Sequence, residues 1–481
     1  MCGIFGVIGS ENAAAEIYIG LMHLQHRGQD AAGILTTDFR NGGSMNMVKE
    51  RGLVANVFDE EKLRQLKGSA GIGHTRYPTI GVASKKEAQP FFLQYPDGIG
   101  MAFNGNIVNY PSLKKYLRDK KRRYLMSDSD AEVMLNLFAS EYLKESGTKS
   151  FFDSVAYLQK ELVGAYSVVG MIANKGIFAF KDPNGIKPLI MGKKEYNGKT
   201  CYAFASESIA LTIQGYNELR DLKPGEVVFI DKKLKVYSRV LNEKKHAHCV
   251  FEWVYFSTVE SEIEDMPVYI ARSKLGEELA NKVKRLWPDL EIDLVIPIPD
   301  TSRPAANSLA YKLGIPYGEG LVKNRYVGRT FIMPVQKSRE YALDLKLKPI
   351  DAMLKGKKVM VVDDSIVRGS TSKKIVKLLR ASGVKKVYFL STFPPIRYPC
   401  YYGIDFQREE ELIAHNKKIK EIEKEIGADK LIYMDVESLK NCIGTELCTA
   451  CVTGDYPTSI GEAKNLQNLR RKHIKRMVRA C

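Results

Sequence analysis

Hydrophobic and polar residues alternate with a different rhythm before and after about residue 250. The first half carries short apolar or alternating runs bounded by Gly, Asn, Asp or Pro, as strands usually are. These runs are GIFGVIG, AAGILTT, SAGIGHT, IGMAFNG, AYSVVGMI, GIFAFKD and EVVFI. Two longer stretches predict helices, at about Ala13–Gln25 after a Ser10 or Asn12 cap and at about Ala131–Lys144 after SDSD. The pattern predicts an α/β or α+β domain of packed sheets.

From about Val250 onward, longer helices alternate with apolar strands. IDLVIPIPD predicts a buried strand, ANSLAYKLG a helix, and KKVMVVDDSIVRGSTSKKIVKLLRASG a strand, a loop and a helix. KKVYFLSTF then predicts a further strand. This alternation is typical of parallel strands covered by helices.

Length and composition place the chain among ordinary globular proteins of several domains. Its 481 residues favour two or three domains, and 44% hydrophobic with 27% charged residues is a typical globular balance. No apolar run reaches the roughly 18 residues that a membrane span needs. The N-terminus also lacks the pattern of a signal peptide. We therefore expect a cytoplasmic protein with no membrane partner.

The net charge of +17 raises the question of nucleic acid, because clustered Lys and Arg neutralise phosphates. Most of the excess is spread along the chain as Lys pairs, and only the tail NLRRKHIKRMVRAC is densely basic. A solvated basic helix explains that tail more simply. We expect no nucleic-acid partner, and a positive surface also suits phosphorylated small substrates.

The cysteine directly after the initiator methionine is the first candidate for chemistry. Methionine before a small residue is readily removed, and we expect the removal of Met1 alone to expose Cys2 as the first residue. Cys2 would then combine a thiol with an α-amine whose ordinary pKa is near 8, a usable base at neutral pH. A buried structural cysteine is the alternative.

Three further stretches supply polar groups of the kinds that acyl transfer needs. GHTRYPTIG places Arg76 after a strand, where a guanidinium could hold a carboxylate by two hydrogen bonds. AFNGNIVNY places Asn104 and Gly105 at a strand-to-turn junction, and both offer N–H donors to an oxyanion. SDSDAE places Asp130 before a helix, as an N-cap or as the partner of a substrate ammonium. Singly, each has a plain structural explanation.

Taken together, MCGIFGVIG, LQHRGQDAAGI, GHTRYPTIG and FNGNIVNY resemble, in order and spacing, the glutaminase domain of class II glutamine amidotransferases. These are N-terminal-nucleophile hydrolases with an αββα sandwich. The resemblance implies that Cys2 attacks the glutamine side-chain amide and that Asn104 with Gly105 forms the oxyanion hole. It also implies that Arg76 binds the α-carboxylate of glutamine and Asp130 its α-ammonium. Such domains deliver ammonia to a partner domain.

In the second half, VMVVDDSIVRGSTSKKIVKLL is the most informative segment. Asp363 and Asp364 end an apolar strand, at the edge where open α/β sheets bind ligands. The hydroxyls of Ser370 and Thr371 and the N-terminus of the following helix form an anion site. Two acids followed by a phosphate cradle indicate a ligand that carries a diol or Mg²⁺ and a phosphate. A surface acidic turn would not explain the apolar strand.

This segment resembles the phosphoribosyl-pyrophosphate (PRPP) fingerprint of type I phosphoribosyltransferases. The resemblance implies that Asp363 and Asp364 hold the ribose hydroxyls and Mg²⁺. IPIPDTSRP looks like the pyrophosphate loop, with Thr301 and Ser302 nearest the metal and the diphosphate and Thr301 the third Mg²⁺ ligand. The residues implied to cradle the 5′-phosphate are Arg368, Gly369, Ser370 and Thr371.

Two details connect the halves. Relatives that use a purine base commonly carry an acid where this chain has Val367, and ammonia, with its free lone pair, needs none. VKNRYVGRTFIMP to about Lys348 resembles a flexible lid loop.

Both halves together resemble glutamine phosphoribosylpyrophosphate amidotransferases, with a glutaminase domain at residues 2–240 and a phosphoribosyltransferase domain at 250–470. That family makes 5-phosphoribosylamine for purine synthesis by internal ammonia transfer. The resemblance implies a homo-tetramer or dimer and feedback by purine nucleotides.

The remaining cysteines suggest a metal site. ELCTACVTG holds a C-x-x-C pair, which alone could be a redox pair, a zinc half-site or part of an iron–sulfur site. Some members of the family carry a structural 4Fe–4S cluster, and this chain matches their ligand motifs, with zinc as the second choice. The matching positions are Cys249, Cys400, Cys448 and Cys451.

The other cysteines and the nearby histidines are predicted to bind no metal. Cys201, Cys442 and Cys481 match no ligand motif, and we expect ordinary thiols. His246 and His248, beside the first cysteine of the set, are expected to be solvated rather than zinc-bound.

Two other functions stay open. Another class II amidotransferase, making asparagine or a hexosamine phosphate, would need an ATP-pyrophosphatase loop or a sugar-isomerase domain, and neither is visible. A regulatory protein could instead sense PRPP and bind nucleic acid through the basic tail. The intact Cys2 constellation argues against it.

Overall fold

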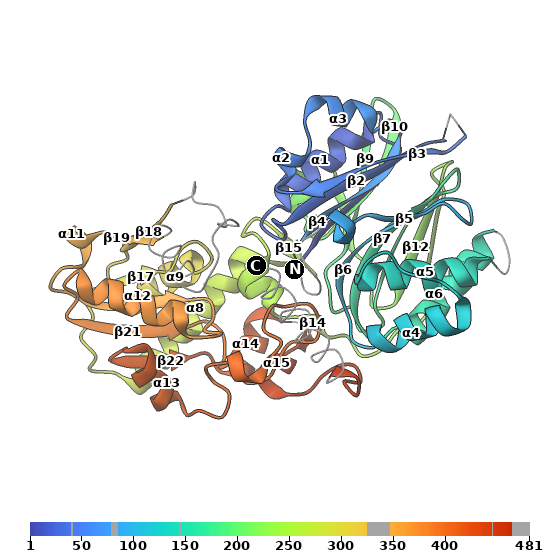
Figure 1. The fold of residues 1–481 in the computed structure, drawn as a ribbon. Coiled ribbons are helices and arrows are strands. Elements are labelled where there is room, and N and C mark those ends of the chain that lie inside the picture. The colour runs from blue at the N-terminus through green and yellow to red at the C-terminus, as the bar shows by residue number, and fades with distance from the viewer. Residues whose placement is uncertain (40–41, 78–84, 144–146, 325–346, 445, 464–481) are drawn as a thin grey trace.

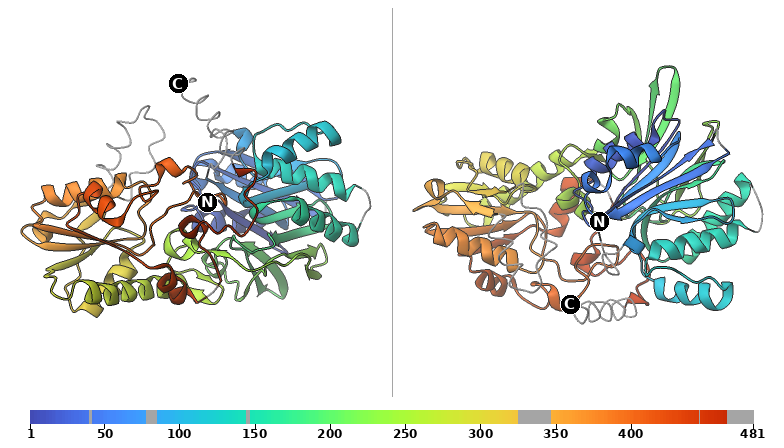
Figure 2. Two further views of the ribbon diagram at one scale, coloured as in Figure 1. Left: turned by 90° about the horizontal axis from the view of Figure 1, so that it is seen from below. Right: turned by 45° about the horizontal axis from the view of Figure 1, so that its top comes forward.

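The computed structural model of the chain describes residues 1–39, 42–77, 85–143, 147–324, 347–444 and 446–463. These residues form two lobes, and the N-terminus lies where the lobes meet (Figures 1 and 2). The first lobe holds the first half of the sequence and the second lobe most of the remainder (Figure 1). The change of pattern near residue 250 therefore corresponds to the passage from one lobe to the other.

The first lobe contains two antiparallel sheets that lie face to face. One sheet has seven strands, in the order β11 (Glu218–Asp221), β9 (Ile190–Tyr196), β10 (Lys199–Ala205), β1 (Gly3–Ile8), β4 (Ala70–Arg76), β2 (Ala31–Asp38), β3 (Ser44–Arg51). The other has six, in the order β13 (Val236–Val240), β12 (Glu226–Asp231), β8 (Gly176–Lys181), β7 (Gly164–Ile172), β6 (Ile99–Ile107), β5 (Phe91–Leu93).

Helices cover the outer faces of both sheets, which completes an αββα sandwich (Figure 1). Apolar side chains such as Ile4, Leu35, Ile72 and Val169 fill the space between the sheets. The helices on the first sheet are α1 (Ala13–His23), α2 (Val54–Val57), α3 (Glu60–Gln65) and α7 (Ile209–Thr212). Those on the second are α4 (Tyr110–Lys121), α5 (Asp130–Tyr142) and α6 (Thr148–Glu161). The predicted fold of the first half is confirmed.

Both predicted helices are present, with small differences at their ends. Helix α1 is capped by the Asn12 side chain, which accepts a hydrogen bond from the Ala15 N–H, and it ends at His23. Helix α5 begins at Asp130, with Ser129 at the N-cap position. The interpretation of Asp130 as an N-cap is therefore wrong. Its carboxylate accepts hydrogen bonds from the backbone N–H groups of Ile107 and Ala131, because the start of α5 packs against the end of β6.

The second lobe is built on a parallel sheet, as the alternation of strands and helices predicts. Its strands, in order, are β17 (Leu294–Pro297), β20 (Lys358–Asp363), β21 (Lys386–Ser391) and β22 (Lys430–Tyr433). One face is covered by α8 (Val268–Leu286), α9 (Arg303–Leu313) and α14 (Val436–Ile443). The other is covered by α12 (Ser370–Ala381) and α13 (Ile419–Ile426).

The remaining elements of the described residues are short. The pair β18 (Leu321–Lys323) and β19 (Leu347–Pro349) flanks the predicted lid loop, most of which lies outside the described residues. The others are η2 (Lys85–Glu87), β14 (His248–Cys249), η3 (Glu252–Phe256), β15 (Glu262–Ile263), β16 (Met266–Pro267), α11 (Asp351–Leu354), η4 (Glu409–Glu411), β23 (Leu447–Cys448) and α15 (Ala450–Thr453).

A buried arginine connects the lobes at the N-terminus. The Arg27 guanidinium donates to Glu207 at 2.6 Å, to both carboxylate oxygens of Glu252 at 2.9 Å, and from Nε to the Cys2 carbonyl at 3.0 Å. All three charged side chains are fully buried. Glu252 belongs to η3, in the segment between the lobes, so this network ties the N-terminal strand to the second lobe.

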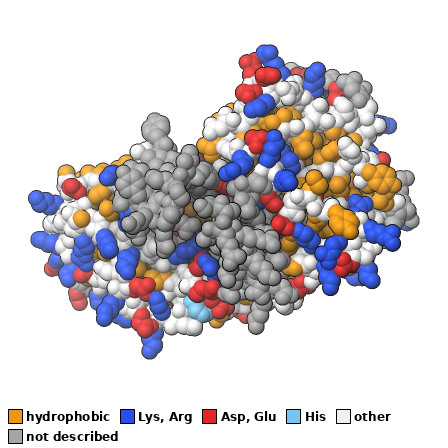
Figure 3. Space-filling view, in the orientation of Figure 1, with side chains coloured by type: hydrophobic (Ala, Val, Ile, Leu, Met, Phe, Trp, Pro, Cys, Tyr) orange, Lys and Arg blue, Asp and Glu red, His pale blue; other side chains and the backbone are white. Residues whose placement is uncertain are grey.

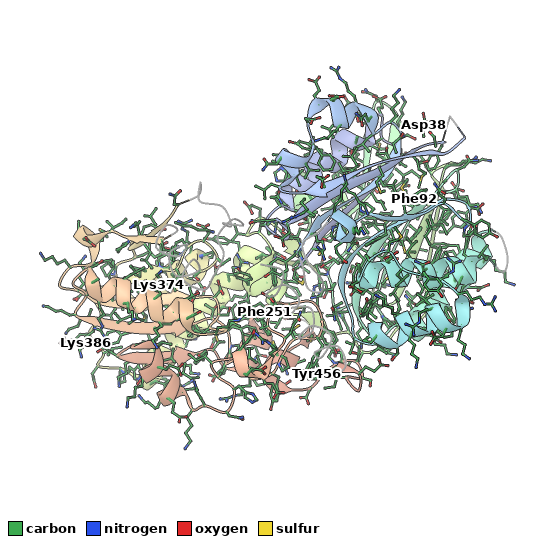
Figure 4. The ribbon with its side chains drawn as sticks, viewed as in Figure 1. Asp38, Phe92, Phe251, Lys374, Lys386 and Tyr456 are labelled. Atoms are coloured by element: carbon green, nitrogen blue, oxygen red, sulfur yellow. The ribbon has the colours of Figure 1, made fainter. Side chains whose placement is uncertain are left out.

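Other contacts between the lobes lie close to this network. The Asn106 side-chain amide donates to the Tyr401 carbonyl at 2.8 Å, and the Tyr77 hydroxyl lies 3.3 Å from an Asp405 carboxylate oxygen. Phe251, labelled between the lobes in Figure 4, packs its ring against two phenylalanines of the second lobe, with centroids 4.5 Å and 5.5 Å away. The junction thus combines hydrogen bonds with aromatic packing.

The helices and one face of the molecule bear on the predictions about membranes and basic charge. In the described part of the chain, no helix combines the length and the apolar composition that a bilayer crossing requires. On the face shown in Figure 3, Lys and Arg side chains of the described residues are dispersed among Asp and Glu. The basic tail lies outside the described residues.

Replacing Arg27 with methionine should destabilise the protein by about 3–5 kcal/mol at pH 7, because two buried carboxylates would lose their cation. His26 and Arg27 overcome the effect of burial and hold the pKa of Glu207 below its ordinary value. The Glu207 carboxylate stabilises the fold above its unfolded pKa near 4.3 and loses this contribution as pH falls. The difference in unfolding free energy between wild type and variant should therefore become smaller below about pH 4. Denaturant unfolding across pH measures both effects. Arg64→Met, at an exposed ion pair, is the control; equal stability of the two variants at pH 7 would contradict the network's importance.

Candidate active sites

The structure places Cys2 beside Asn104. The Cys2 backbone N–H donates to Asn104 Oδ1 at 3.1 Å, and the Tyr77 N–H points to the Cys2 sulfur at 3.4 Å. Cys2 precedes β1 of one sheet and Asn104 lies on β6 of the other, so the sandwich itself brings them together. The Asn104 Nδ2 is buried and has no hydrogen-bond partner among the described residues. An unfilled donor next to a thiol is the geometry that an oxyanion site needs.

Gly105 is fixed by the close approach of its neighbour strand. A Cβ at this position would lie 2.0 Å from the Ala165 carbonyl oxygen of β7, so no other residue fits without a shift of backbone. Its own carbonyl also lies close to the second lobe, since a Cβ on Gly403 would be 3.0 Å from it. The backbone N–H of residue 105 is thereby held in place beside Asn104.

Arg76 and Asp130 are both buried, at the end of β4 and the start of α5. Glu87 connects their surroundings. One Glu87 oxygen lies 3.5 Å from Arg76 Nη2, and the other accepts the Asp128 backbone N–H at 2.9 Å in the turn that leads into α5. Burial raises the pKa of Glu87. No sequence motif indicated this role, because Glu87 stands in none that is recognisable.

Met1 is buried between Cys2 and a buried lysine. Its side chain is 1% exposed, and its sulfur lies 2.9 Å from Lys187 Nζ. Burial lowers the pKa of the Met1 α-amine to about 5. An amine in this pocket is therefore neutral at pH 7, which is the state that a general base requires. Lys187 and Arg27 are the residues around the N-terminus that the sequence did not single out.

The second site surrounds the end of β20. Asp363 is the last residue of that strand and Asp364 follows it, as predicted. Both carboxylates are buried; burial raises both pKa values, and their mutual repulsion raises that of Asp363 further. The Thr301 hydroxyl donates a short hydrogen bond to Asp364, and Ser302 is buried with no partner for its hydroxyl among the described residues. Two neighbouring acids with raised pKa values mark a candidate cation or diol site.

The predicted phosphate cradle begins α12. Gly369 is the N-cap in the left-handed region, at φ 73°, where a Cβ would meet Ile413 at 2.1 Å, so glycine is required. Ser370 and Thr371 are exposed in the first turn. The Arg368 side chain already pairs with Glu411 at 2.8 Å and donates to the Asp405 carbonyl at 3.0 Å, so a ligand would have to compete for it.

The four cysteines of the predicted cluster come together near the junction. Cys249 of β14 pairs in register with Cys448 of β23, and all four are buried. Burial raises the pKa of the Cys249 thiol to about 11, and burial and the neighbouring cysteines raise that of Cys451. In the described residues no three of these sulfurs lie within 4.8 Å of one another. Tetrahedral zinc bound by thiolates would need sulfurs about 3.8 Å apart.

The prediction of solvated histidines is wrong for His248. Its side chain is fully buried, because the pairing of β14 with β23 carries it into the interior. His246 is 26% exposed, and both rings contact Glu264. Cys201 is buried in another hydrophobic cluster of the first lobe. Cys442 is buried on α14, in the hydrophobic cluster that also contains the four cysteines.

Two known domain families match separate parts of the chain. Residues 74–213 match the glutamine amidotransferase domain family, and residues 268–427 match the phosphoribosyl transferase domain family. The two matches contain Asn104 and the Asp363–Asp364 pair, respectively.

Relatives cover nearly the whole chain. The amidophosphoribosyltransferase of Pseudomonas aeruginosa is 45% identical over 92% of this chain and 89% of its own. That of Saccharomyces cerevisiae is 42% identical over 98% and 95%. The solved structure of glutamine PRPP amidotransferase from B. subtilis, complexed with ADP and GMP, aligns with a TM-score of 0.85 and 38% identity over 95% of this chain and 98% of that one. On this similarity and on its two domains, the chain belongs to the amidophosphoribosyltransferase family.

Proposed function

We propose that this enzyme hydrolyses glutamine at Cys2 and transfers the ammonia to PRPP held at Asp363 and Asp364. The products would be glutamate, pyrophosphate and 5-phosphoribosylamine, for purine synthesis. The observation that carries the proposal is the pairing of Cys2 with the unfilled Asn104 amide in a lobe joined, through Arg27, to the lobe of the buried acid pair.

The glutaminase half follows from the groups around Cys2. After the removal of Met1, the nitrogen that donates to Asn104 Oδ1 becomes a free α-amine, which in its neutral form can act as a base. The amine accepts the thiol proton while sulfur attacks the amide carbon of glutamine. The oxyanion receives hydrogen bonds from Asn104 Nδ2 and the Gly105 N–H. The proton returns to the leaving nitrogen, ammonia departs, and water hydrolyses the thioester to glutamate.

Arg76 and Asp130 orient the substrate in this proposal. Arg76 is assigned to the α-carboxylate of glutamine and Asp130 to its α-ammonium. Both side chains are buried. Glu87 contacts Arg76 and accepts the Asp128 N–H in the turn before Asp130, so the fold holds both residues in fixed positions. Such positioning converts much of the entropic cost of the reaction into binding.

The transferase half uses the end of β20 and the start of α12. Thr301, Asp363 and Asp364 are assigned to Mg²⁺ and to the ribose and diphosphate of PRPP, together with Ser302. Two buried acids whose pKa values are raised suit a divalent cation, which would neutralise charge on the departing pyrophosphate. The residues assigned to the 5′-phosphate are Arg368, Gly369, Ser370 and Thr371. Ammonia needs no base, in keeping with the half-buried Val367.

The four cysteines fit a 4Fe–4S cluster better than zinc, because their sulfurs are buried, converge and are too widely spaced for one ion. The Tyr402 N–H donates to the Cys400 sulfur at 3.4 Å, a hydrogen bond that suits a cluster thiolate. A bound cluster would cross-link segments that are distant in sequence. We assign it this structural role and no step of the reaction.

Further assignments remain proposals. The glutaminase domain is assigned to residues 2–240 and the phosphoribosyltransferase domain to 250–470, limits that contain both family matches. Feedback by purine nucleotides is supported by the B. subtilis relative, whose structure is complexed with ADP and GMP. We also propose a cytoplasmic homo-tetramer or dimer.

Cys2→Ser should lower glutamine-dependent formation of phosphoribosylamine by about 10³-fold or more, because the nucleophile is lost. Activity with free ammonia should stay within about twofold, since the acceptor site is separate. Both rates are measured by release of pyrophosphate. Cys201→Ser, a buried cysteine elsewhere in the same lobe, is the control. Loss of both activities in Cys2→Ser alone would refute the division of labour.

Cys451→Ser should remove the brown colour and the iron expected of anaerobically purified protein, because one thiolate ligand is missing. Cys442→Ser, which changes another buried cysteine, should keep both. Iron and sulfide analysis with absorption spectroscopy tests this. A colourless, zinc-loaded wild-type protein would overturn the assignment.

Asp363→Asn should stabilise the protein free of divalent cations at pH 8, by an amount within the usual 0.5–3 kcal/mol of single substitutions, while abolishing transferase activity. The pKa of Asp363 is raised by burial and by Asp364, so the folded state favours its protonated form and loses stability as pH rises above the unfolded value near 3.9. The gain should therefore shrink toward pH 4. Thermal unfolding in EDTA measures it, with the exposed Asp153→Asn as control. A gain independent of pH would contradict this origin.

A further inference from the structure

Three metal-ligating side chains converge beside the junction, outside both candidate active sites. His246 and His248 lie just before and on β14, and Glu264 lies in the turn between β15 and β16. Each offers one ligand atom, and these atoms lie within 4.8 Å of one another. Glu264 Oε1 is 2.9 Å from His248 Nδ1 and 3.0 Å from His246 Nε2. One carboxylate oxygen therefore stands between two imidazoles.

Hydrogen bonding does not account for all of this cluster. His246 Nε2 makes no hydrogen bond within the described residues although it lies 3.0 Å from the carboxylate, so the ring nitrogen is not aimed at that oxygen. His248 is fully buried, and its Nε2 also has no hydrogen-bond partner there. Of the two contacts with the Glu264 carboxylate, only that of His248 Nδ1 is a hydrogen bond. The His246 imidazole stands beside the same oxygen without one, as a second ligand of a shared ion would.

The backbone holds the three positions independently of any ion. The His248 N–H donates to the Glu446 carbonyl at 3.0 Å in the pairing of β14 with β23. Glu264 adopts a left-handed conformation, at φ 49°, and its N–H donates to Asp221 Oδ2 at 3.0 Å. The ligand geometry is thus preorganised by strand pairing on one side and by a tight turn anchored to β11 on the other.

The local charge also favours a cation. The carboxylates of Glu264 and Asp221 face one buried ammonium, that of Lys181, which acts on both electrostatically. Two carboxylates against that one ammonium leave an excess of negative charge among these three side chains. The Trp253 ring, 4.7 Å from the His248 ring, closes the site on an apolar side, while His246 is 26% exposed and leaves access to solvent.

We propose that His246, His248 and Glu264 bind one divalent transition-metal ion of the zinc class. Two imidazole nitrogens and a carboxylate oxygen are ligands that zinc accepts, with water in the fourth position. Zinc bonds of about 2.0 Å place tetrahedral ligand atoms about 3.3 Å apart, so the observed contacts need to open by only a few tenths of an ångström. The ion would pin the β15–β16 turn to the strand that carries Cys249.

Titration with Co²⁺ distinguishes this site from the four cysteines. Cobalt on histidine and carboxylate shows visible d–d bands without the near-ultraviolet charge-transfer band that thiolate ligands produce. Anaerobically purified, cluster-loaded protein, freed of loosely bound ions by a chelator, should bind one such cobalt per chain, and added Zn²⁺ should displace it. Absence of these bands in the wild-type protein, or a thiolate band alone, would overturn the proposal.

Substitutions locate the ion. Glu264→Gln and His246→Asn should weaken cobalt binding at least about tenfold, since loss of an outer-shell partner alone costs 10–100-fold. Glu262→Gln, on the same hairpin but exposed, should bind like the wild type. The partly exposed His246 provides a variant with little risk to the fold, and thermal unfolding without metal verifies that each variant is folded. Equal affinities of Glu264→Gln and Glu262→Gln would place the ion elsewhere and refute the site.

Discussion

The burial of the Arg27 guanidinium is the constraint on which the rest of the molecule depends. A cation without access to water is tolerated only while its partners stay in place, and its partners come from the N-terminus, from Glu207 after β10, and from Glu252 in η3. The Cys2 backbone therefore cannot move without disturbing the segment between the lobes. That segment continues directly from Cys249, so the position of Cys2 is coupled to that of the four cysteines.

Both candidate active sites contain buried polar or acidic groups that lack a full set of hydrogen-bond partners or opposite charges among the described residues. Asn104 Nδ2 is a buried donor without an acceptor in the described residues, and Asp363 and Asp364 are neighbouring buried acids. Such groups cost folding free energy, and a protein retains them where a ligand supplies the missing partner. Arg368 shows the opposite state, since Glu411 already neutralises it. A phosphate bound at the start of α12 would therefore have to replace Glu411 as the partner of Arg368.

Features that depend on residues close together in the chain could be predicted from the sequence. Asp363 at the end of an apolar strand, Gly369 before a helix and Asn104 beside Gly105 follow from short-range patterns. The packed sheets of the first half and the parallel sheet of the second follow from strand and helix periodicity, while the αββα order was implied by the family resemblance. The sequence could not predict the partners of Arg27 or the burial of His248, because these depend on residues distant in the chain meeting through strand pairing. The same reason explains Asp130, whose carboxylate serves the end of β6 instead of capping its own helix.

The cysteines and the His–Glu cluster stand at opposite ends of the same short strand, β14, and this placement has a physical consequence. A metal bound by residues far apart in sequence removes conformational freedom mainly from the unfolded chain, and its binding free energy becomes part of the folding free energy. Ions at both ends of β14 would therefore stabilise the junction selectively, more than either lobe. Ammonia is small, neutral and easily lost to water, so its transfer requires that the lobes keep their relative position. A junction held by buried charge, and by the proposed metal ligands once they bind their ions, would provide that rigidity where a hydrophobic contact alone would allow sliding.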